Sequence, residues 1–136
     1  IQAAVLNVKL RHLTKWNEAR RERADYYTQQ LSSIPGIKTP VERSECYHVY
    51  HQYVIRIPER DKARNLFQER QVGCGVFYPI PLHRQPCFAP YRAAGDSCGN
   101  AKCACSEALA LPLYPEMTAS QQNQVIDVLA DHAKSM

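Results

Sequence analysis

The sequence predicts an α+β fold, in which a small antiparallel sheet of about three strands carries helices on one face and is preceded by a long N-terminal helix. The expected elements follow one another in the order α–β–β–α–β–α–α, so the strands are interleaved with helices. The chain contains five glycines, and none form the G-x-G-x-x-G turn of a doubly wound nucleotide-binding sheet. Its 136 residues are 45% hydrophobic and 22% charged, which fits one domain, residues 1–136, with a modest core.

The first expected helix is long and spans residues 1–33. Apolar residues recur there at helical spacing, and these are Leu6, Leu10, Leu13, Ala24, Tyr27 and Leu31. A single helix of this length would extend roughly 50 Å at about 1.5 Å per residue, so we expect an interdomain-type helix. Its apolar rhythm is interrupted at residues 17–20, where the helix would leave one contact surface for another. Because no capping residue precedes the rhythm at Ile1, we also expect the sequence to be a fragment of a longer protein.

The remaining residues, 37–136, are expected to form the small α+β domain. Residues 37–41 read as a short extended piece, and residues 49–57 alternate between two faces as a half-buried strand does. Helical apolar spacing follows in "RDKARNLFQERQ", residues 60–71. The stretch "VGCGVFYP", residues 72–79, predicts a further strand whose glycines allow another backbone or a ligand to approach closely.

Two more helices are expected toward the C-terminal end. The stretch "CSEALALPLYPEM", residues 105–117, suggests a short helix ended by Pro112. Thr118 and Gln121 have the spacing of a capping box. They predict a final helix that continues to about Ala133.

A proline-rich loop, "VFYPIPLHRQP", residues 76–86, carries the first candidate site residues. Pro79 and Pro81 restrict the backbone, so Tyr78 and His83 are held with little conformational entropy left to lose. Such a loop suits a hydrogen-bonding wall around a hydroxylated ligand. A plain rigid turn explains the same residues, and the residues themselves leave both interpretations open.

Other histidines and tyrosines precede this loop in the chain. His51 fits either a ligand contact or a core histidine that is hydrogen-bonded on its strand face, and the second interpretation is favoured. His48 and Tyr50 fit packing at a strand edge. No G-x-S-x-G elbow, H-E-x-x-H motif or phosphate-binding loop accompanies them.

The six cysteines give no complete metal or nucleophile pattern. Cys98, Cys103 and Cys105 are spaced C-x4-C-x-C, and no second knuckle completes the ligands of a structural zinc site. Free, partly buried thiols are therefore expected, and no metal. A nucleophile pair of Cys87 with His83 lacks a nearby group to orient the base.

Charge and hydropathy exclude further classes of partner. The net charge is +4, and much of it lies in residues 15–27. Glu18, Glu22 and Asp25 interrupt this run, which favours a solvated helix face over a nucleic-acid patch. No stretch reaches the roughly 20 apolar residues of a membrane span, and no signal peptide opens the chain, so a cytoplasmic protein is expected.

Three stretches together resemble a known family. They are "IQAAVLNVKLRHLTKWNEARRERADYYTQQL", "HVYHQYVIRIPERDKARNLFQERQVGCGVFYPIPLHRQPCF" and "ALALPLYPEMTASQQNQVIDVLA". In this order they look like the C-terminal part of the DegT/DnrJ/EryC1/StrS family of sugar aminotransferases. The resemblance implies the small domain of a pyridoxal-phosphate-dependent enzyme of the aspartate aminotransferase fold. Such enzymes move an amino group, commonly from glutamate, to a nucleotide-linked keto-sugar, and they work as homodimers with sites at the interface. Some relatives were first described as pleiotropic regulators.

The resemblance assigns expected roles to the proline loop. It implies that Tyr78 and His83 face the sugar nucleotide. Phe77 departs from the pattern, because many relatives have histidine there, and it remains a possible substrate contact together with His51. Residues 95–108 also depart, with glycine and cysteines at an expected helix start, so that helix is expected to be shifted or frayed.

The family's cofactor groups have no counterpart here. The resemblance places the Schiff-base lysine, the partner of the pyridine nitrogen and the phosphate contacts in a domain that precedes this segment, and neither Lys9 nor Lys15 matches that lysine. We therefore expect a chain that is inactive by itself and that holds no pyridoxal phosphate. An apolar stripe on the first helix should then drive self-association. The alternative is a stand-alone binding or regulatory module that uses the same fold without catalysis.

Overall fold

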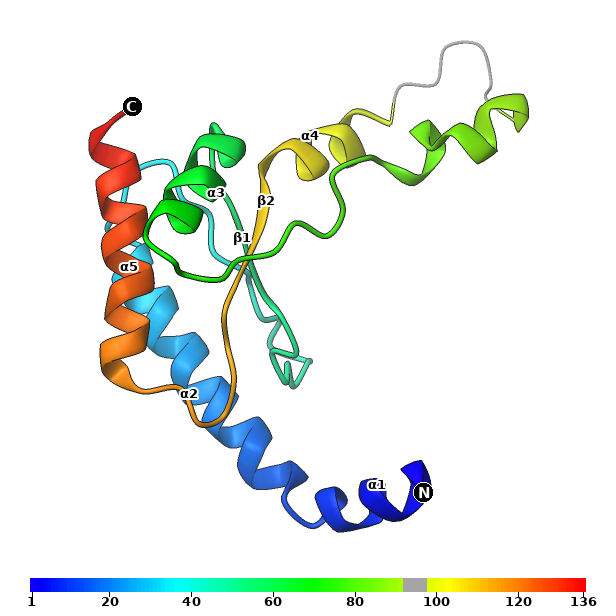
Figure 1. The fold of residues 1–136 in the computed structure, drawn as a ribbon, viewed down its shortest axis with the longest axis vertical. Helices are drawn as coiled ribbons and strands as arrows, with labels where there is room; N and C mark the ends of the chain where they lie inside the picture. The colour runs from blue at the N-terminus through cyan, green and yellow to red at the C-terminus, as the bar shows by residue number, and fades with distance from the viewer. Residues whose placement is uncertain (92–97) are drawn as a thin grey trace.

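The structure is a computed structural model that describes residues 1–91 and 98–136. Figure 1 shows its elements in chain order, with the short 3₁₀ segments unlabelled. They are α1 (Gln2–Leu10), α2 (Leu13–Leu31), β1 (Tyr53–Arg56), α3 (Arg60–Glu69), η1 (Leu82–Arg84), η2 (Pro86–Tyr91), α4 (Gly99–Glu107), β2 (Ala108–Leu111) and α5 (Ala119–Lys134). No helix among these residues is long and apolar enough to cross a membrane.

The N-terminal helical region is two helices rather than the single helix expected over residues 1–33. The break falls at Arg11 and His12, ahead of the interruption in apolar rhythm. His12 has φ −102° and ψ −6°, away from helical values. Its backbone N–H donates to the Lys9 carbonyl at 2.9 Å, which tightens the last turn of α1. Neither proline nor glycine marks this break, so helix propensity gave no signal for it.

The sheet contains two antiparallel strands where about three were expected. β1 pairs with β2 from Tyr53 opposite Leu111 to Arg56 opposite Ala108. The expected strands at 37–41 and 72–79 contribute only single bridges among the described residues, with Lys38 opposite Arg56 and Gly75 opposite Ala110. The two bridges lie on the outer edges of β1 and β2, so the extended segments flank the pair without forming longer ladders.

β2 overturns the expectation of a short helix over residues 105–117. Ala and Leu favour helices, and "ALAL" contains no β-branched residue. However, Leu109, Ala110 and Leu111 are buried, and β1 supplies their backbone partners. Tertiary pairing therefore outweighs local propensity in this segment, and helical structure ends with α4 at Glu107.

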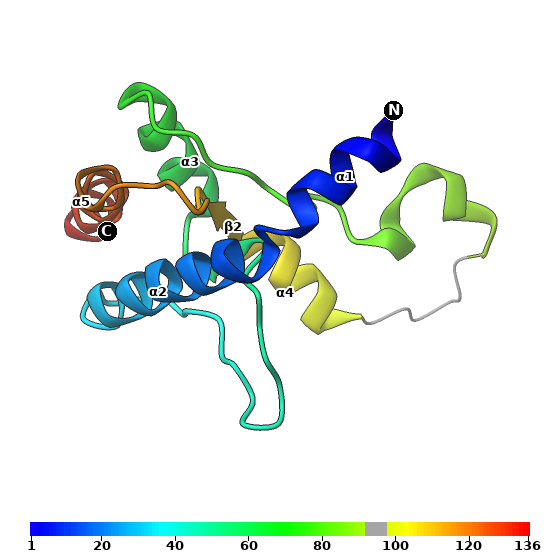
Figure 2. The same ribbon diagram turned by 90° about the horizontal axis from the view of Figure 1, so that it is seen from below.

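Helices α2, α3 and α5 gather on one side of the strand pair, as Figure 2 shows, and α5 contacts both α2 and α3. This agrees with an α+β layer in which helices cover one face. The fully buried side chains join these helices to the strands, and the largest are Tyr27, Tyr53, Phe67, Leu31, Ile55, Ile57, Leu109, Leu129 and Val125. The predicted helices at α3 and α5 are confirmed, as is the capping box between Thr118 and Gln121.

Candidate functional site

The proline loop leaves the sheet edge at Gly75. This residue exchanges two backbone hydrogen bonds with Ala110, at 2.9 and 2.7 Å. A Cβ added to Gly75 would lie 2.6 Å from the ring of Phe77, so the ring occupies space that any larger residue would need. The expected close approach at this glycine is therefore real, and the chain itself makes it.

The predicted site residues of the loop sit at different depths. Tyr78 is 72% exposed and Phe77 is 49% exposed. Their rings meet edge to face with centroids 5.9 Å apart. His83 is half-buried within η1. The structure thus places Tyr78 where a hydroxylated ligand can reach it, between Phe77 and the rigid Pro79–Pro81 segment.

His51 lies elsewhere, in the loop that precedes β1. It is exposed and stands outside the strand, so the core-histidine interpretation is wrong. Together with Tyr47 and His48 it lines a separate, shallow surface cavity. His48 Nδ1 accepts a hydrogen bond from the Tyr50 backbone N–H at 2.8 Å, and Tyr50 itself is buried. No described contact brings His51 to the proline loop.

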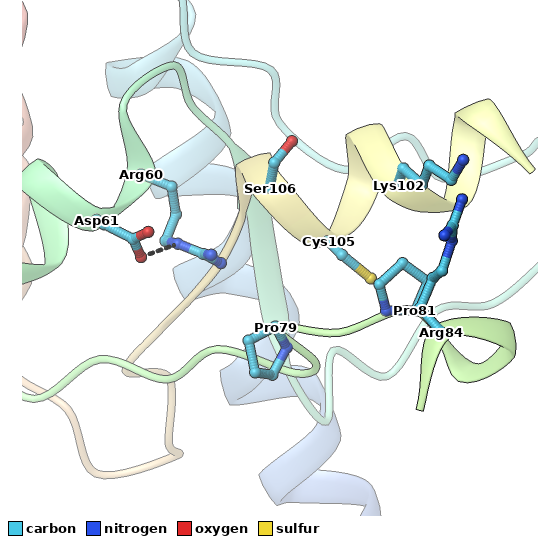
Figure 3. A pocket seen from close by; sticks show the side chains of 8 residues that line it. All are labelled: Arg60, Asp61, Pro79, Pro81, Arg84, Lys102, Cys105 and Ser106. Carbon is cyan, nitrogen blue, oxygen red and sulfur yellow. Dashed lines mark hydrogen bonds and ion pairs between the residues drawn. The ribbon is translucent and has the colours of Figure 1, made fainter. Parts of the chain in front are cut away.

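Two cavities flank Pro79. The first, of about 450 Å³, is lined by Arg60, Asp61, Pro79, Pro81, Arg84, Lys102, Cys105 and Ser106 (Figure 3). The second, of about 570 Å³, is lined by Arg60, Asp61, Arg64, Cys74, Val76 and Pro79. The proline loop is therefore a wall of both cavities, with α3 opposite it and α4 closing the first.

Arg60 fixes the floor between these cavities. Its side chain is 5% exposed. Its Nε donates to Asp61 Oδ1 at 2.7 Å, and its Nη1 donates to the Ala108 carbonyl at 3.0 Å. These bonds tie the first turn of α3 to the start of β2 and satisfy a guanidinium that would be costly to bury without partners.

The basic lining was not identified from sequence. Arg60, Arg84 and Lys102 come from α3, η1 and α4, which are far apart along the chain. No short motif contains them, and only the packing of these elements brings them together. The spacing of the prolines predicted the loop, whereas nothing local predicted the cations it faces.

The cysteines make no metal centre among the described residues. All six are free thiols. Cys103 Sγ accepts from Arg56 Nη2 and donates to Glu107 Oε1, both at 3.1 Å. The pKa of the Glu107 carboxyl lies below its ordinary value, chiefly because of this Cys103 hydrogen bond and also because of the Arg56 pair, against the opposing effect of burial. The thiol therefore fastens α4 to β1.

The expected disturbance at residues 95–108 can be judged in part. Residues 95–97 lie outside the described residues. From Gly99 the chain is helical, and Cys98 at its N-cap makes no side-chain capping bond. The helix therefore forms despite the departure from the family's pattern.

The lysines do not fit the cofactor of an aminotransferase. Lys102 is half-buried, and the five others are exposed, namely Lys9, Lys15, Lys38, Lys62 and Lys134. An imine with a pyridoxal aldehyde needs a lysine in an enclosed, desolvated site where water cannot hydrolyse it. No lysine of this chain stands in such a site, so the residues present do not fit pyridoxal phosphate.

Comparison with known proteins gives a consistent result. Residues 1–130 match the model described as the DegT/DnrJ/EryC1/StrS aminotransferase family. The chain is 41% identical to a "pleiotropic regulatory protein" of Geobacillus stearothermophilus, covering 96% of this chain and 36% of that protein. It is 32% identical to the dTDP-3-amino-3,4,6-trideoxy-alpha-D-glucose transaminase of Streptomyces venezuelae, covering 98% and 35%.

A solved structure agrees in shape. S. venezuelae DesV, crystallised with a ketimine intermediate, superposes with a TM-score of 0.92 at 32% identity, and the match covers 98% of this chain and 36% of that one. The present chain therefore spans about a third of the length of the relatives that it matches.

Proposed function

We propose that this chain, which belongs to the DegT/DnrJ/EryC1/StrS aminotransferase family, forms the substrate-side C-terminal domain of a pyridoxal-phosphate-dependent nucleotide-sugar aminotransferase. In this role it supplies one wall of the pocket that receives a nucleotide-linked keto-sugar. The observation that carries the proposal is the match of 98% of the chain, at a TM-score of 0.92, to a third of a structure that holds a reaction intermediate.

The proline loop supplies the contacts to the sugar in this proposal. The exposed hydroxyl of Tyr78 and the ring nitrogens of His83 donate to and accept from sugar hydroxyls. Phe77 offers an apolar ring face beside them. Because Pro79 and Pro81 fix the loop before the ligand arrives, little conformational entropy is lost on binding. His51, in its separate cavity, is the weaker candidate.

This chain is inactive by itself in the proposed function. Amino transfer needs an aldehyde cofactor held as an imine, with a charged ring nitrogen as electron sink. The exposed lysines do not meet the first need. The catalytic groups therefore belong to further parts of a longer protein, and the present residues bind and orient the substrate.

The apolar face of α1 and of the start of α2 fits the same proposal. α1 buries none of its side chains. A groove of about 390 Å³ follows this face and is lined by Leu6, Asn7, Lys9, Leu10, Leu13 and Trp16. Its occupant in the longer protein is the part that the relatives have beyond this third. In the isolated chain a second copy takes that place.

Binding of nucleotide sugars by this chain tests the proposal. We expect UDP- or dTDP-linked hexoses to shift backbone NMR signals of residues 76–86, with weak affinity because only one wall is present. Tyr78→Phe combined with His83→Ala should reduce that affinity at least about tenfold, since two hydrogen bonds to the ligand are lost. Tyr91→Phe with His12→Ala is the matched control. Unchanged binding by the first variant would contradict the assignment.

A stand-alone regulatory module is the second candidate, because the relative that is 41% identical is named a pleiotropic regulatory protein. In that case the chain binds a protein partner and does not respond to nucleotide sugars. In either role we place it in the cytoplasm, because six free thiols suit a reducing compartment.

A further inference from the structure

The two cavities beside Pro79 carry a marked excess of positive charge. Arg60, Arg64, Arg84 and Lys102 line them, and Asp61 is the one carboxylate among the described lining residues. Asp61 is already bonded to Arg60 at 2.7 Å. The remaining cations therefore act on the cavities without a lining carboxylate to offset them, which favours an anionic ligand.

Arg84 and Lys102 define where such an anion would lie. Figure 3 shows both side chains extending to the same end of the first cavity, away from the Arg60–Asp61 pair. Arg84 comes from the proline loop and is exposed, and Lys102 comes from α4 and is half-buried. Ser106 does not compete for the ligand, because its hydroxyl donates to the Cys103 carbonyl at 2.8 Å.

The order of residues along the loop connects this end of the cavity to the sugar wall. His83 and Arg84 are adjacent in η1. A ligand whose hydroxyls meet Tyr78 and His83 would therefore bring a neighbouring group to Arg84. In a nucleotide-linked sugar, the group that neighbours the sugar is a diphosphate. A guanidinium and an ammonium that converge from two elements suit such a group.

We propose that Arg84 and Lys102 form the subsite for the diphosphate of the nucleotide-linked substrate, with Arg60 and Arg64 adding a positive field behind them. This inference rests on the proposed function and specifies which residues hold the charged part of the ligand. Arg60 acts through its charge, because its Nε and Nη1 are occupied by protein acceptors.

The test compares ligands and charge-matched variants. UDP, UDP-glucose, uridine and inorganic pyrophosphate are titrated into the chain by NMR. We expect UDP and UDP-glucose to bind, uridine to bind at least about tenfold more weakly, and binding to weaken as salt is raised. Arg84→Gln with Lys102→Gln should weaken UDP binding at least about tenfold and flatten its salt dependence. Lys62→Gln with Lys134→Gln removes the same charge from exposed positions and should leave UDP binding unchanged.

The outcomes separate this proposal from the one it rests on. If both double variants bind UDP as the unmodified chain does, the diphosphate subsite is wrong. If the Arg84/Lys102 variant is unaffected while the Tyr78/His83 variant loses UDP-glucose, the sugar wall stands and the subsite fails. Pyrophosphate that binds as tightly as UDP-glucose would show a simple phosphate site and overturn the nucleotide assignment. If the unmodified chain binds none of the four, both proposals fail.

Discussion

Tyr27 and Tyr53 show how single polar groups are fitted into the core. Both side chains are fully buried, and their ring centroids lie 5.3 Å apart. The Tyr27 hydroxyl donates to the Pro112 carbonyl at 3.1 Å, and the Tyr53 hydroxyl lies 2.8 Å from Thr28 Oγ1. Burial raises the pKa of Tyr53 to about 12. Each phenol is thus satisfied in its neutral form, which ties α2 to β1 and to the residues after β2.

The raised pKa of Tyr53 predicts a loss of stability in alkali. An unfolded tyrosine loses its proton near about pH 10, and the folded Tyr53 loses it near about pH 12. Between these values the unfolded state binds fewer protons, so the free energy of unfolding falls as pH rises. Below about pH 10 the contribution of this group is fully present.

Urea denaturation from pH 8 to 12 measures this effect. Tyr53→Phe should cost about 1 kcal/mol at pH 8, because the hydrogen bond to Thr28 is lost. Its stability should then decline less steeply above pH 10 than that of the unmodified chain. Tyr26→Phe removes an exposed phenol bonded to Asn123 and serves as the control. Parallel pH curves for Tyr53→Phe and the unmodified chain would argue against the assignment.

At the scale of elements, the helices α1 and α2 differ in what covers them. The second half of α2 is anchored in the core by Ala24, Tyr27 and Leu31. By contrast, Leu6 is 63% exposed and Leu10 is 65% exposed. Burying a leucine of this kind contributes about 1.5–3 kcal/mol. The uncovered face of α1 is therefore a strong site of association in the isolated chain.

Sedimentation velocity tests this association. We expect the chain to form dimers or larger species as its concentration rises, and Leu6→Ser with Leu10→Ser to shift it toward monomer. Val41→Ser with Met136→Ser removes other exposed apolar side chains, at 86% and 54% exposure, and should leave association unchanged. A chain that stays monomeric at high concentration would refute the role given to this face.

The elements also show what sequence can and cannot predict. α5 was predictable because its capping box and apolar spacing are local. The strand β2 was not, because its alanines and leucines favour a helix and only pairing with β1 makes it extended. The proline loop was visible as a rigid segment, whereas Lys102 reaches its cavity through the packing of α4. Local signals therefore gave the wall of the site, and long-range contacts gave its charge.

At the scale of the whole molecule, the chain combines a closed core with surfaces that lack partners. The core joins α2, α3 and α5 to the strand pair (Figure 2). The α1 face and the cavities beside Pro79 remain open. This is the form expected of one part of a larger catalyst, and it agrees with a match to about a third of its relatives' length.

The most direct measurement mixes the purified chain with pyridoxal phosphate, removes unbound cofactor by desalting, and records the absorbance of the protein-bound imine. The chain should retain no imine band, because its lysines are exposed or, at Lys102, only half-buried, and an imine formed there hydrolyses as free cofactor is removed. Borohydride reduction after desalting should accordingly leave no lysine stably labelled at one position. A band that persists in proportion to the protein, traced to one lysine, would contradict the assignment of this chain to the substrate side alone.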